Sequence, residues 1–170
     1  MQNALFAATH RPSADYILAN LATFPITVYY DHSCMLCRSE ILHMKARDTR
    51  AALVLVDCSI ATFDDSALPV SQAQLMDCIH AQDAQGRWLK ATEVFIAIYR
   101  EVGLNRVASA WRLGKPLAEK MYPWIVRNRH WLSKLGIHHM FNWMTARHLR
   151  QLADALLEQS RTCQDNRCER

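Results

Sequence analysis

The chain has 170 residues, of which about half are hydrophobic and about a fifth are charged, the composition of an ordinary soluble globular protein with a real core. Residues 1–99 carry seven Lys/Arg and ten Asp/Glu, whereas residues 100–170 carry thirteen and six, so the two parts have formal charges of −3 and +7. These features exclude a disordered, repetitive or collagen-like chain, and the longest apolar runs are far too short to cross a bilayer.

The first half of the chain predicts a β–α–β unit. Residues 14–22 indicate a short leading helix, and residues 26–30 are β-branched and aromatic, as is typical of a strand. A helical pattern follows over residues 34–47, and residues 53–57 predict a second, buried strand. This spacing implies a parallel strand pair joined by a crossover helix.

The second half predicts a hairpin followed by helices. Residues 58–73 give no clear pattern, but residues 75–81 and 87–90 predict two strands, with Gly86 supplying a positive φ in the turn between them. After Thr92 the pattern is helical, and each of the other three glycines (Gly103, Gly114 and Gly136) follows an apolar periodic segment, as a helix-ending glycine does. We expect residues 162–170 to be frayed.

The most informative motif is Asp31-His32-Ser33-Cys34-Met35-Leu36-Cys37, directly after the first predicted strand. Cys34 would lie at a helix N-terminus, where free N–H groups and the helix dipole favour a thiolate. Cys37, one turn later, could resolve a mixed disulfide that Cys34 had formed. The helical spacing of both cysteines with Ile41 and Met44 places Cys37 against the core and Cys34 at the exposed helix start.

Neighbouring residues predict how the thiols are tuned. His32 and Arg38 are close enough in sequence to lower the pKa of Cys34, and His32 is the better candidate because it precedes the helix. Asp31 has two interpretations, which the sequence leaves open. It could cap the helix, or it could move the proton of Cys37 during resolution.

Strand–helix–strand, then hairpin, then helix is the thioredoxin-like order, and a CxxC after the first strand is where that fold carries its redox site. The expected fold is therefore an α/β thioredoxin-like core with an all-helical C-terminal extension. We expect an N-terminal extension over residues 1–24, the core over 25–103 and the helical extension over 104–170.

The sequence resembles the DCC family of predicted thiol–disulfide oxidoreductases, named for its Asp–Cys–Cys motif. Asp31, Cys34 and Cys37 match D-x-x-C-x-x-C, although His32 stands where the family often has glycine. Residues 81–87 and the helix from Thr92 resemble the second block of the family, and Tyr122 followed by Arg127-Asn128-Arg129 resembles its C-terminal Y…RNR signature. The resemblance covers residues 25–136 and implies a dithiol enzyme.

We expect Arg127 and Arg129 to serve structure near the motif and not to bind nucleic acid. Either arginine could hold the basic helices against the acidic core, and Asp31 is a possible partner. The dispersed basic residues of the C-terminal part could also contact nucleic acid or an anionic membrane, but a solvated helical face is the simpler interpretation. Tyr122 and the tryptophans of this part are expected to pack between helices.

The expected activity is dithiol–disulfide exchange, with Cys34 attacking and Cys37 resolving a protein or small-molecule disulfide. No organic cofactor is expected, because the four glycines form no phosphate-binding loop. Electrons would come from a cellular thiol pool or a reductase. Residues 1–10 lack the pattern of a signal peptide, so we expect a cytoplasmic protein.

Three alternatives stay open. A structural zinc site would need a second ligand pair, for which the sequence offers only Cys163 and Cys168 beside His138-His139, and we expect no metal. The chain could instead be a binding or adaptor module with a vestigial CxxC. It could also be a glutathione-transferase-like enzyme, although two nearby cysteines suit disulfide exchange better. Cys58 and Cys78 are expected to be small buried hydrophobic residues.

Overall fold

The computed structural model describes the backbone of residues 22–165 and the side chains of residues 22–160. The predicted leading helix over 14–22 lies almost wholly outside this range. The side chains of Cys163 and Cys168 also lie outside the described residues. The elements are β1 (Ile26–Tyr30), α2 (Met35–Lys45), β2 (Leu53–Asp57), α3 (Gln72–Asp77), β3 (His80–Gln82), β4 (Trp88–Lys90), α4 (Thr92–Glu101), α5 (Asn105–Leu113), α6 (Lys115–Lys134) and α7 (Ile137–Asp165).

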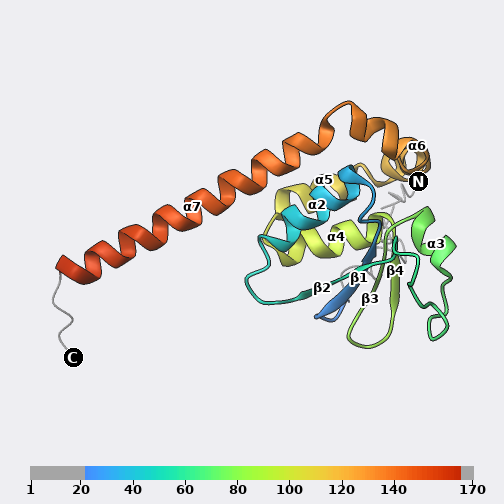
Figure 1. Cartoon of the computed structure of the whole chain (residues 1–170), viewed down its shortest axis with the longest axis horizontal. Coiled ribbons are helices and arrows are strands. Elements are labelled where there is room, and N and C mark those ends of the chain that lie inside the picture. The colour runs from blue at the N-terminus through green and yellow to red at the C-terminus, as the bar shows by residue number, and fades with distance from the viewer. Residues whose placement is uncertain (1–21, 166–170) are drawn as a thin grey trace, which may run out of the picture.

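The four strands form one mixed sheet in the order β2-β1-β3-β4, with β1 parallel to β2 and antiparallel to β3 (Figure 1). Both strands of the predicted parallel pair have the expected bounds, and the α/β class with a helical C-terminal region is confirmed and consistent with a thioredoxin-like fold. The sequence anticipated these strands because β-branched and aromatic residues favour a sheet. The expectation that residues 53–57 form a buried strand is wrong, because β2 lies at the edge of the sheet, where only Leu53 is buried and Val54 is exposed.

The sheet is covered on both faces, and β1 alternates between them. Ile26, Val28 and Tyr30 pack in the main core with α2 and α4, whereas Tyr29 packs on the opposite face with Cys58 and Leu75. This alternation follows from the two-residue period of a strand. Residues 26 and 28 are completely buried, so the strand that leads into the cysteine motif is rigidly held.

One predicted strand is partly wrong. Residues 75–77 belong to helix α3, and the strand begins only at His80. Ser71 begins α3 with a reciprocal capping box, in which its hydroxyl accepts from the Gln74 N–H and the Gln74 amide oxygen accepts from the Ser71 N–H. This local cap specifies a helix that apolar periodicity alone could not distinguish from a strand.

A positive φ, as expected for a glycine in a hairpin turn or at a helix end, is found at three of the four glycines. Gly86, Gly103 and Gly136 have φ of 81°, 77° and 80°, which favours glycine. Gly114 has φ −85° and joins α5 to α6 without a left-handed residue. The chain after Thr92 is helical up to residue 165, so the fraying expected from residue 162 is not seen as far as the backbone is described.

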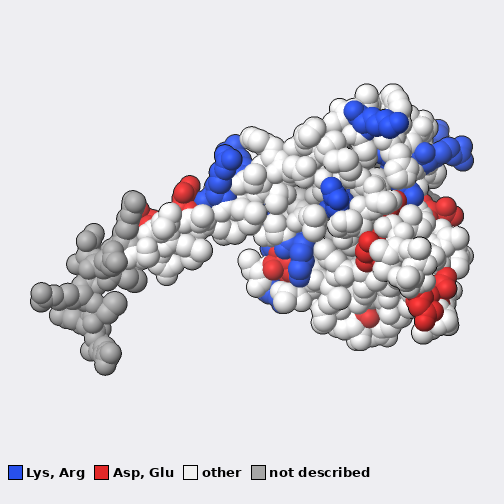
Figure 2. Space-filling view, viewed as in Figure 1, with Lys and Arg blue, Asp and Glu red and all other residues white. Residues whose placement is uncertain are grey.

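Helices α6 and α7 pack against α2, so the C-terminal helices contact the helix that carries the cysteines. Beyond that contact α7 projects from the body (Figure 1). Basic side chains stand over α6, and acidic ones gather near α3 and the neighbouring loops (Figure 2). The division at residue 103 stays a prediction, which expression of residues 25–103 alone would test.

Among the described residues, no helix combines the length and hydropathy that crossing a membrane requires.

Candidate functional site

Cys34 is the N-cap residue of α2, and its Sγ accepts a hydrogen bond from the backbone N–H of Cys37 at 3.4 Å. The sulfur therefore occupies the place where the side-chain oxygen of an ordinary cap would lie. A negative charge at this position is stabilised by the N–H group and by the dipole of the helix. The predicted location of Cys34 at the helix start is confirmed.

The expected exposures of the two cysteines are wrong. Cys34 is completely buried, whereas Cys37 is partly exposed. The reason is that α6 and α7 cover the start of α2, with Leu132, Ile125 and Phe141 packed around the thiols. Helical periodicity within α2 could not show this cover, because it comes from residues about 100 positions later in the chain.

Ser133 of α6 completes the first turn of α2. Its hydroxyl accepts from the Leu36 N–H at 3.1 Å, donates to the Arg129 carbonyl at 2.8 Å, and lies 3.9 Å from the Cys34 sulfur. The first N–H groups of a helix have no partner within the helix, so another element must supply one when they are buried. Ser133 is a site residue that sequence reasoning missed.

The environment separates the two thiols electrostatically. Hydrogen bonds from the Cys37 thiol and the Cys37 N–H lower the pKa of Cys34 to about 6, the polar contact with Ser133 adds to this lowering, and burial opposes it. The pKa of Cys37 is strongly raised by its bond to the Cys34 sulfur and by burial. At neutral pH the site therefore holds a thiolate at Cys34 and a thiol at Cys37.

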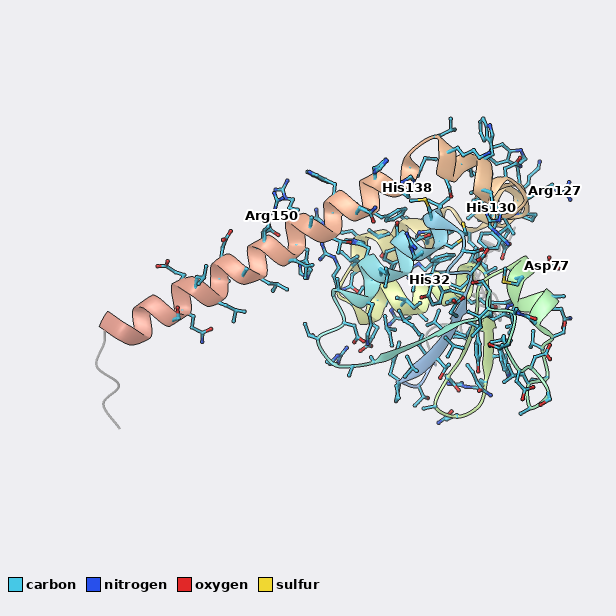
Figure 3. All side chains as sticks on the ribbon, in the orientation of Figure 1. His32, Asp77, Arg127, His130, His138 and Arg150 are labelled. Atoms are coloured by element: carbon cyan, nitrogen blue, oxygen red, sulfur yellow. The ribbon has the colours of Figure 1, made fainter. Side chains whose placement is uncertain are left out.

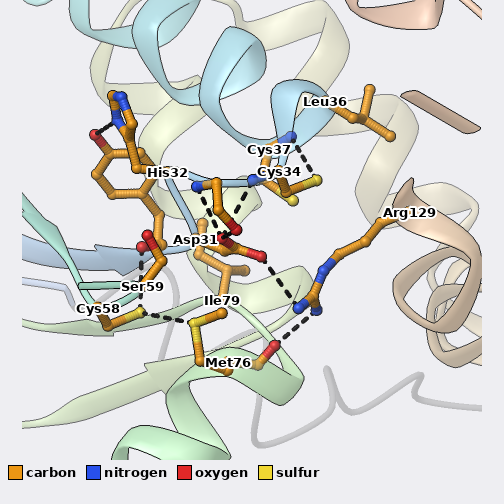
Figure 4. Close-up of polar contacts among 12 residues, drawn as sticks. Asp31, His32, Cys34, Leu36, Cys37, Cys58, Ser59, Met76, Ile79 and Arg129 are labelled. Carbon is orange, nitrogen blue, oxygen red and sulfur yellow. Dashed lines mark hydrogen bonds and ion pairs between the residues drawn. The ribbon is translucent and has the colours of Figure 1, made fainter. Parts of the chain in front are cut away.

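Asp31 is buried, and its two carboxylate oxygens contact different partners (Figure 4). Its Oδ1 accepts from the N–H and hydroxyl of Ser33 and from the Cys34 N–H, at 3.2 Å for the last. Its Oδ2 forms an ion pair with Arg129 at 3.1 Å, so of the two arginines for which the sequence offered Asp31 as a possible partner, Arg129 makes the contact. Arg129 also donates to the Met76 carbonyl at 2.7 Å, so it joins α6, α3 and the motif. These contacts fit the capping interpretation of Asp31.

A cavity of about 80 Å³ lies beside Cys37, bounded largely by apolar side chains. Glu40, one turn after Cys37 on α2, lines the same cavity and accepts a hydrogen bond from the Tyr99 hydroxyl at 3.0 Å. Burial raises the pKa of Glu40 to about 7. This places a group that can exchange a proton near neutral pH beside the thiol that must lose one.

Two of the predicted tuning residues lie elsewhere. The ring of His32 faces the Tyr30 hydroxyl, 2.8 Å from its Nδ1, and lies away from the two sulfurs (Figure 4). The Arg38 guanidinium lowers the pKa of Tyr30 and is not among the main groups that shift the pKa of Cys34. The expectation that these residues lower the pKa of Cys34 is therefore not supported by their positions.

Tyr122 and Arg127 of α6 have different environments. The Tyr122 hydroxyl accepts from the Ile79 N–H at 3.2 Å, and the ring lines the cavity beside Cys37. Arg127 is exposed and borders an outer groove of about 650 Å³ together with Asp77 and His130 (Figure 3). Arg127 therefore does not share the buried ion pair of its neighbour Arg129.

The four cysteines whose side chains are described are free thiols. Cys58 is completely buried, as expected, and burial raises its pKa to about 11. Cys78 is only partly buried and borders both the cavity and the outer groove, so the expected burial holds for it only in part. Within the described part of the chain, no three His, Cys, Asp or Glu side chains are grouped to hold a metal ion.

The sequence of the chain was compared with known protein families. The model of the DCC1-like thiol-disulfide oxidoreductase family matches residues 28–135, which include the cysteine motif, Glu40, Tyr122 and Ser133. The chain belongs to the DCC1-like family. No curated protein and no solved structure matches the chain. Membership of the DCC1-like family and the Cys34–Cys37 pair together support a thiol–disulfide oxidoreductase role.

Three site residues had a weak signal or none in the sequence. Glu40 is a carboxylate placed between Cys37 and Ile41 on the stripe that was expected to face the core, and a charge at such a position is a signal of function. Leu132 and Ser133 lie at the end of the Y…RNR block, and nothing in their local sequence shows that this turn packs on the cysteines.

Proposed function

We propose that this DCC1-like protein is a dithiol–disulfide oxidoreductase in which Cys34 is the attacking thiol and Cys37 the resolving thiol. The observation that carries the proposal is the Cys34 sulfur at the N-cap of α2, hydrogen-bonded by the Cys37 N–H. This contact stabilises the thiolate, which is the nucleophile in disulfide exchange.

In the first step the Cys34 thiolate attacks one sulfur of a substrate disulfide. A new S–S bond joins Cys34 to the substrate, and the other substrate sulfur leaves as a thiolate that takes a proton from water. In the second step the Cys37 sulfur attacks Cys34 and releases the second substrate thiol. Two electrons pass to the substrate, and the protein is left with a Cys34–Cys37 disulfide. A cellular thiol or a reductase of the cytoplasm then reduces it.

The second step needs a base, because Cys37 must lose its proton before it can attack, and burial still raises its pKa once Cys34 is held in the mixed disulfide. We assign this role to Glu40, which borders the cavity beside Cys37 and can take the proton through water in that space. Asp31 suits the role less well, because Oδ1 already accepts three hydrogen bonds and Oδ2 pairs with Arg129. Asp31 instead positions the Cys34 N–H, and Arg129 positions Asp31.

Access to Cys34 depends on α6. The thiolate is fully buried beneath Leu132 and Ser133, so a substrate must displace the end of α6 before the sulfurs can align. The proposal therefore includes an opening at the α6–α7 junction, near Gly136. The cavity on the Cys37 side provides the space next to the reacting pair.

The proposal is tested by trapping the mixed disulfide. Reduced protein is mixed with bis(2-hydroxyethyl) disulfide, and adducts are located by mass spectrometry in the Cys37→Ser and Cys34→Ser variants. Cys37→Ser should accumulate an adduct on Cys34, because the resolving thiol is absent, and Cys34→Ser should react slowly. The Cys58→Ser variant is the matched control and should behave like the parent.

Iodoacetamide labelling of the reduced protein across pH measures the same thiol independently. Labelling of Cys34 should follow a titration with a midpoint near 6, in agreement with its lowered pKa. An adduct that forms on Cys37 in Cys34→Ser, with none in Cys37→Ser, would reverse the two roles. If neither variant forms an adduct in folded protein, the binding-module interpretation replaces the enzyme.

A further inference from the structure

Helix α6 carries an exposed apolar stripe. Five large side chains, each between 46% and 63% exposed, recur at spacings of four, three, seven and four residues, which places them along one side of the helix: Leu117, Met121, Trp124, Trp131 and Leu135. The side of α6 that faces the core is a different one, marked by the buried Leu132 and Ser133. The stripe is therefore not needed for packing within the described chain.

A row of basic residues runs beside the stripe. Lys120, Arg127 and Lys134 are exposed and recur every seven residues, so they lie on one line along α6. The only acidic residue of this helix is Glu119, which pairs with Lys115 at 3.4 Å. Figure 2 shows blue side chains on the white surface over α6, while the red ones near that end of the body lie over α3 and its neighbours.

The apolar surface extends beyond the stripe toward α5. Between α5 and α6 it continues into an apolar groove of about 340 Å³, which is lined in part by Val107, Trp111 and Leu117. A separate exposed ring lies on the first part of α7, where Trp143 is 60% exposed and has the Arg147 guanidinium 5.6 Å from its ring centre. An exposed apolar surface of this extent on a soluble domain marks an interaction site.

The composition of the face indicates what covers it. A second copy of the chain would bring two basic rows together without acidic side chains on either face to pair with them. A nucleic acid would match the basic row but would leave Leu117, Met121 and Leu135 without an apolar partner. Leucine and tryptophan on one side of a helix, with lysine and arginine beside them, suit the boundary between headgroups and acyl chains.

We propose that the α6 face, defined as the stripe together with Lys120, Arg127 and Lys134, binds the surface of an anionic phospholipid bilayer. The helix lies parallel to the bilayer, the stripe inserts among the acyl chains near the headgroups, and the basic row contacts the phosphates. The Leu132–Ser133 turn that covers Cys34 belongs to the same helix, so a bound bilayer would lie next to the cover of the redox site.

Binding is measured by flotation of the full chain with vesicles. One set contains phosphatidylcholine alone, and the other contains phosphatidylcholine with phosphatidylglycerol. The protein should float with the anionic vesicles and not with the neutral ones, and binding should weaken as salt is raised. Brominated acyl chains should quench the tryptophan fluorescence, because Trp124 and Trp131 insert.

Two variants separate the apolar and basic contributions. Lys120→Gln/Lys134→Gln should weaken partitioning roughly 25-fold, since each lysine near such a surface contributes about fivefold. Trp124→Gln/Trp131→Gln keeps all the charges and should abolish quenching and most of the binding. Arg100→Gln is the matched control, because this exposed arginine lies at the end of α4 away from α6, and it should bind like the parent.

Other outcomes would overturn the proposal. If protein with a native circular dichroism spectrum does not float with anionic vesicles, the proposal fails. If the protein floats but its tryptophan fluorescence is not quenched, it adsorbs by charge alone, and the proposal fails as well. Sedimentation that shows a dimer abolished by Trp124→Gln/Trp131→Gln would assign the face to a second copy. Tighter binding to single-stranded or duplex nucleic acid than to the vesicles would assign it to nucleic acid. None of these results depends on disulfide exchange, so the proposed activity is judged separately.

Discussion

Replacing Arg129 by Ala tests the contact that joins α6 to the cysteine motif. The guanidinium forms an ion pair with the buried Asp31 at 3.1 Å and donates to the Met76 carbonyl at 2.7 Å, and its side chain is only 15% exposed. Removing it leaves the Asp31 carboxylate buried with no opposite charge. We therefore expect a large loss of stability from this one substitution.

The magnitude follows from the burial of the partner. Breaking a buried ion pair by removing one member costs about 3–5 kcal/mol, because the remaining charge is left uncompensated. Arg129 retains some exposure, so water can partly solvate Asp31 in the variant and the lower end, about 3 kcal/mol, is expected. For a chain of this length such a loss lowers the melting temperature by roughly 6–12 °C. Arg129→Lys should recover part of it, because one ammonium cannot reach both partners as the guanidinium fork does.

Urea unfolding at neutral pH, followed by circular dichroism, measures the free energy. Arg127→Ala is the matched control, because this residue lies two positions away on α6 and is exposed. The control should remain within about 0.5 kcal/mol of the parent. If Arg129→Ala is as stable as Arg127→Ala, with unchanged dependence on urea, the ion pair does not hold α6 to the motif and the reasoning fails.

Three further predictions concern the covered thiol and its proton. Leu132→Ala should speed alkylation of Cys34 several-fold by opening its cover. Leu135→Ala, which changes an exposed residue at the end of the same helix, should not, and equal rates in the two variants would refute the claim that Leu132 covers the thiol. Burial raises the pKa of Glu40 from 4.5 to about 7, so stability should fall as pH rises across that range, and urea unfolding of Glu40→Gln should lose this dependence. Ser133→Ala should raise the pKa of Cys34 in iodoacetamide titrations and cost about 1–3 kcal/mol by leaving the Leu36 N–H unsatisfied; an unchanged titration would contradict this.

The parts of the fold that the sequence predicted are those fixed by local pattern. The strands 26–30 and 53–57 have their expected bounds, because β-branched and aromatic residues favour strands. The burial expected for residues 53–57 was wrong, since the position of a strand at the edge of the sheet cannot be read from its own residues. The segment at 75–81 was misassigned, because a short apolar run is compatible with a helix or a strand and the Ser71 cap decided between them. Gly114 shows the same limit, since its φ depends on how α5 meets α6.

For the site, the sequence identified the groups but not their surroundings. The placement of Cys34 at the helix start was anticipated. Asp31 was a possible partner of Arg127 or Arg129, because an arginine offsets the effect of a carboxylate on a nearby thiol, and the structure pairs it with Arg129. The burial of Cys34 was not anticipated, since it depends on contacts between α2 and helices far along the chain. His32 was expected to act on Cys34, but β1 directs its ring toward Tyr30.

The hydrogen bond from the Leu36 N–H to the Ser133 hydroxyl joins residues that are 97 positions apart. During synthesis the two cysteines are therefore made well before the turn that covers them. A ribosome adds roughly 5–20 residues per second, so the cysteines exist for roughly 5–20 s before the turn that covers them has been made. During that interval Cys34 lies open to any small oxidant or mixed disulfide in its surroundings. An adduct formed then would occupy the space into which Leu132 and Ser133 must pack. Newly made chains would therefore depend on a reducing environment to close the site, before any substrate is met.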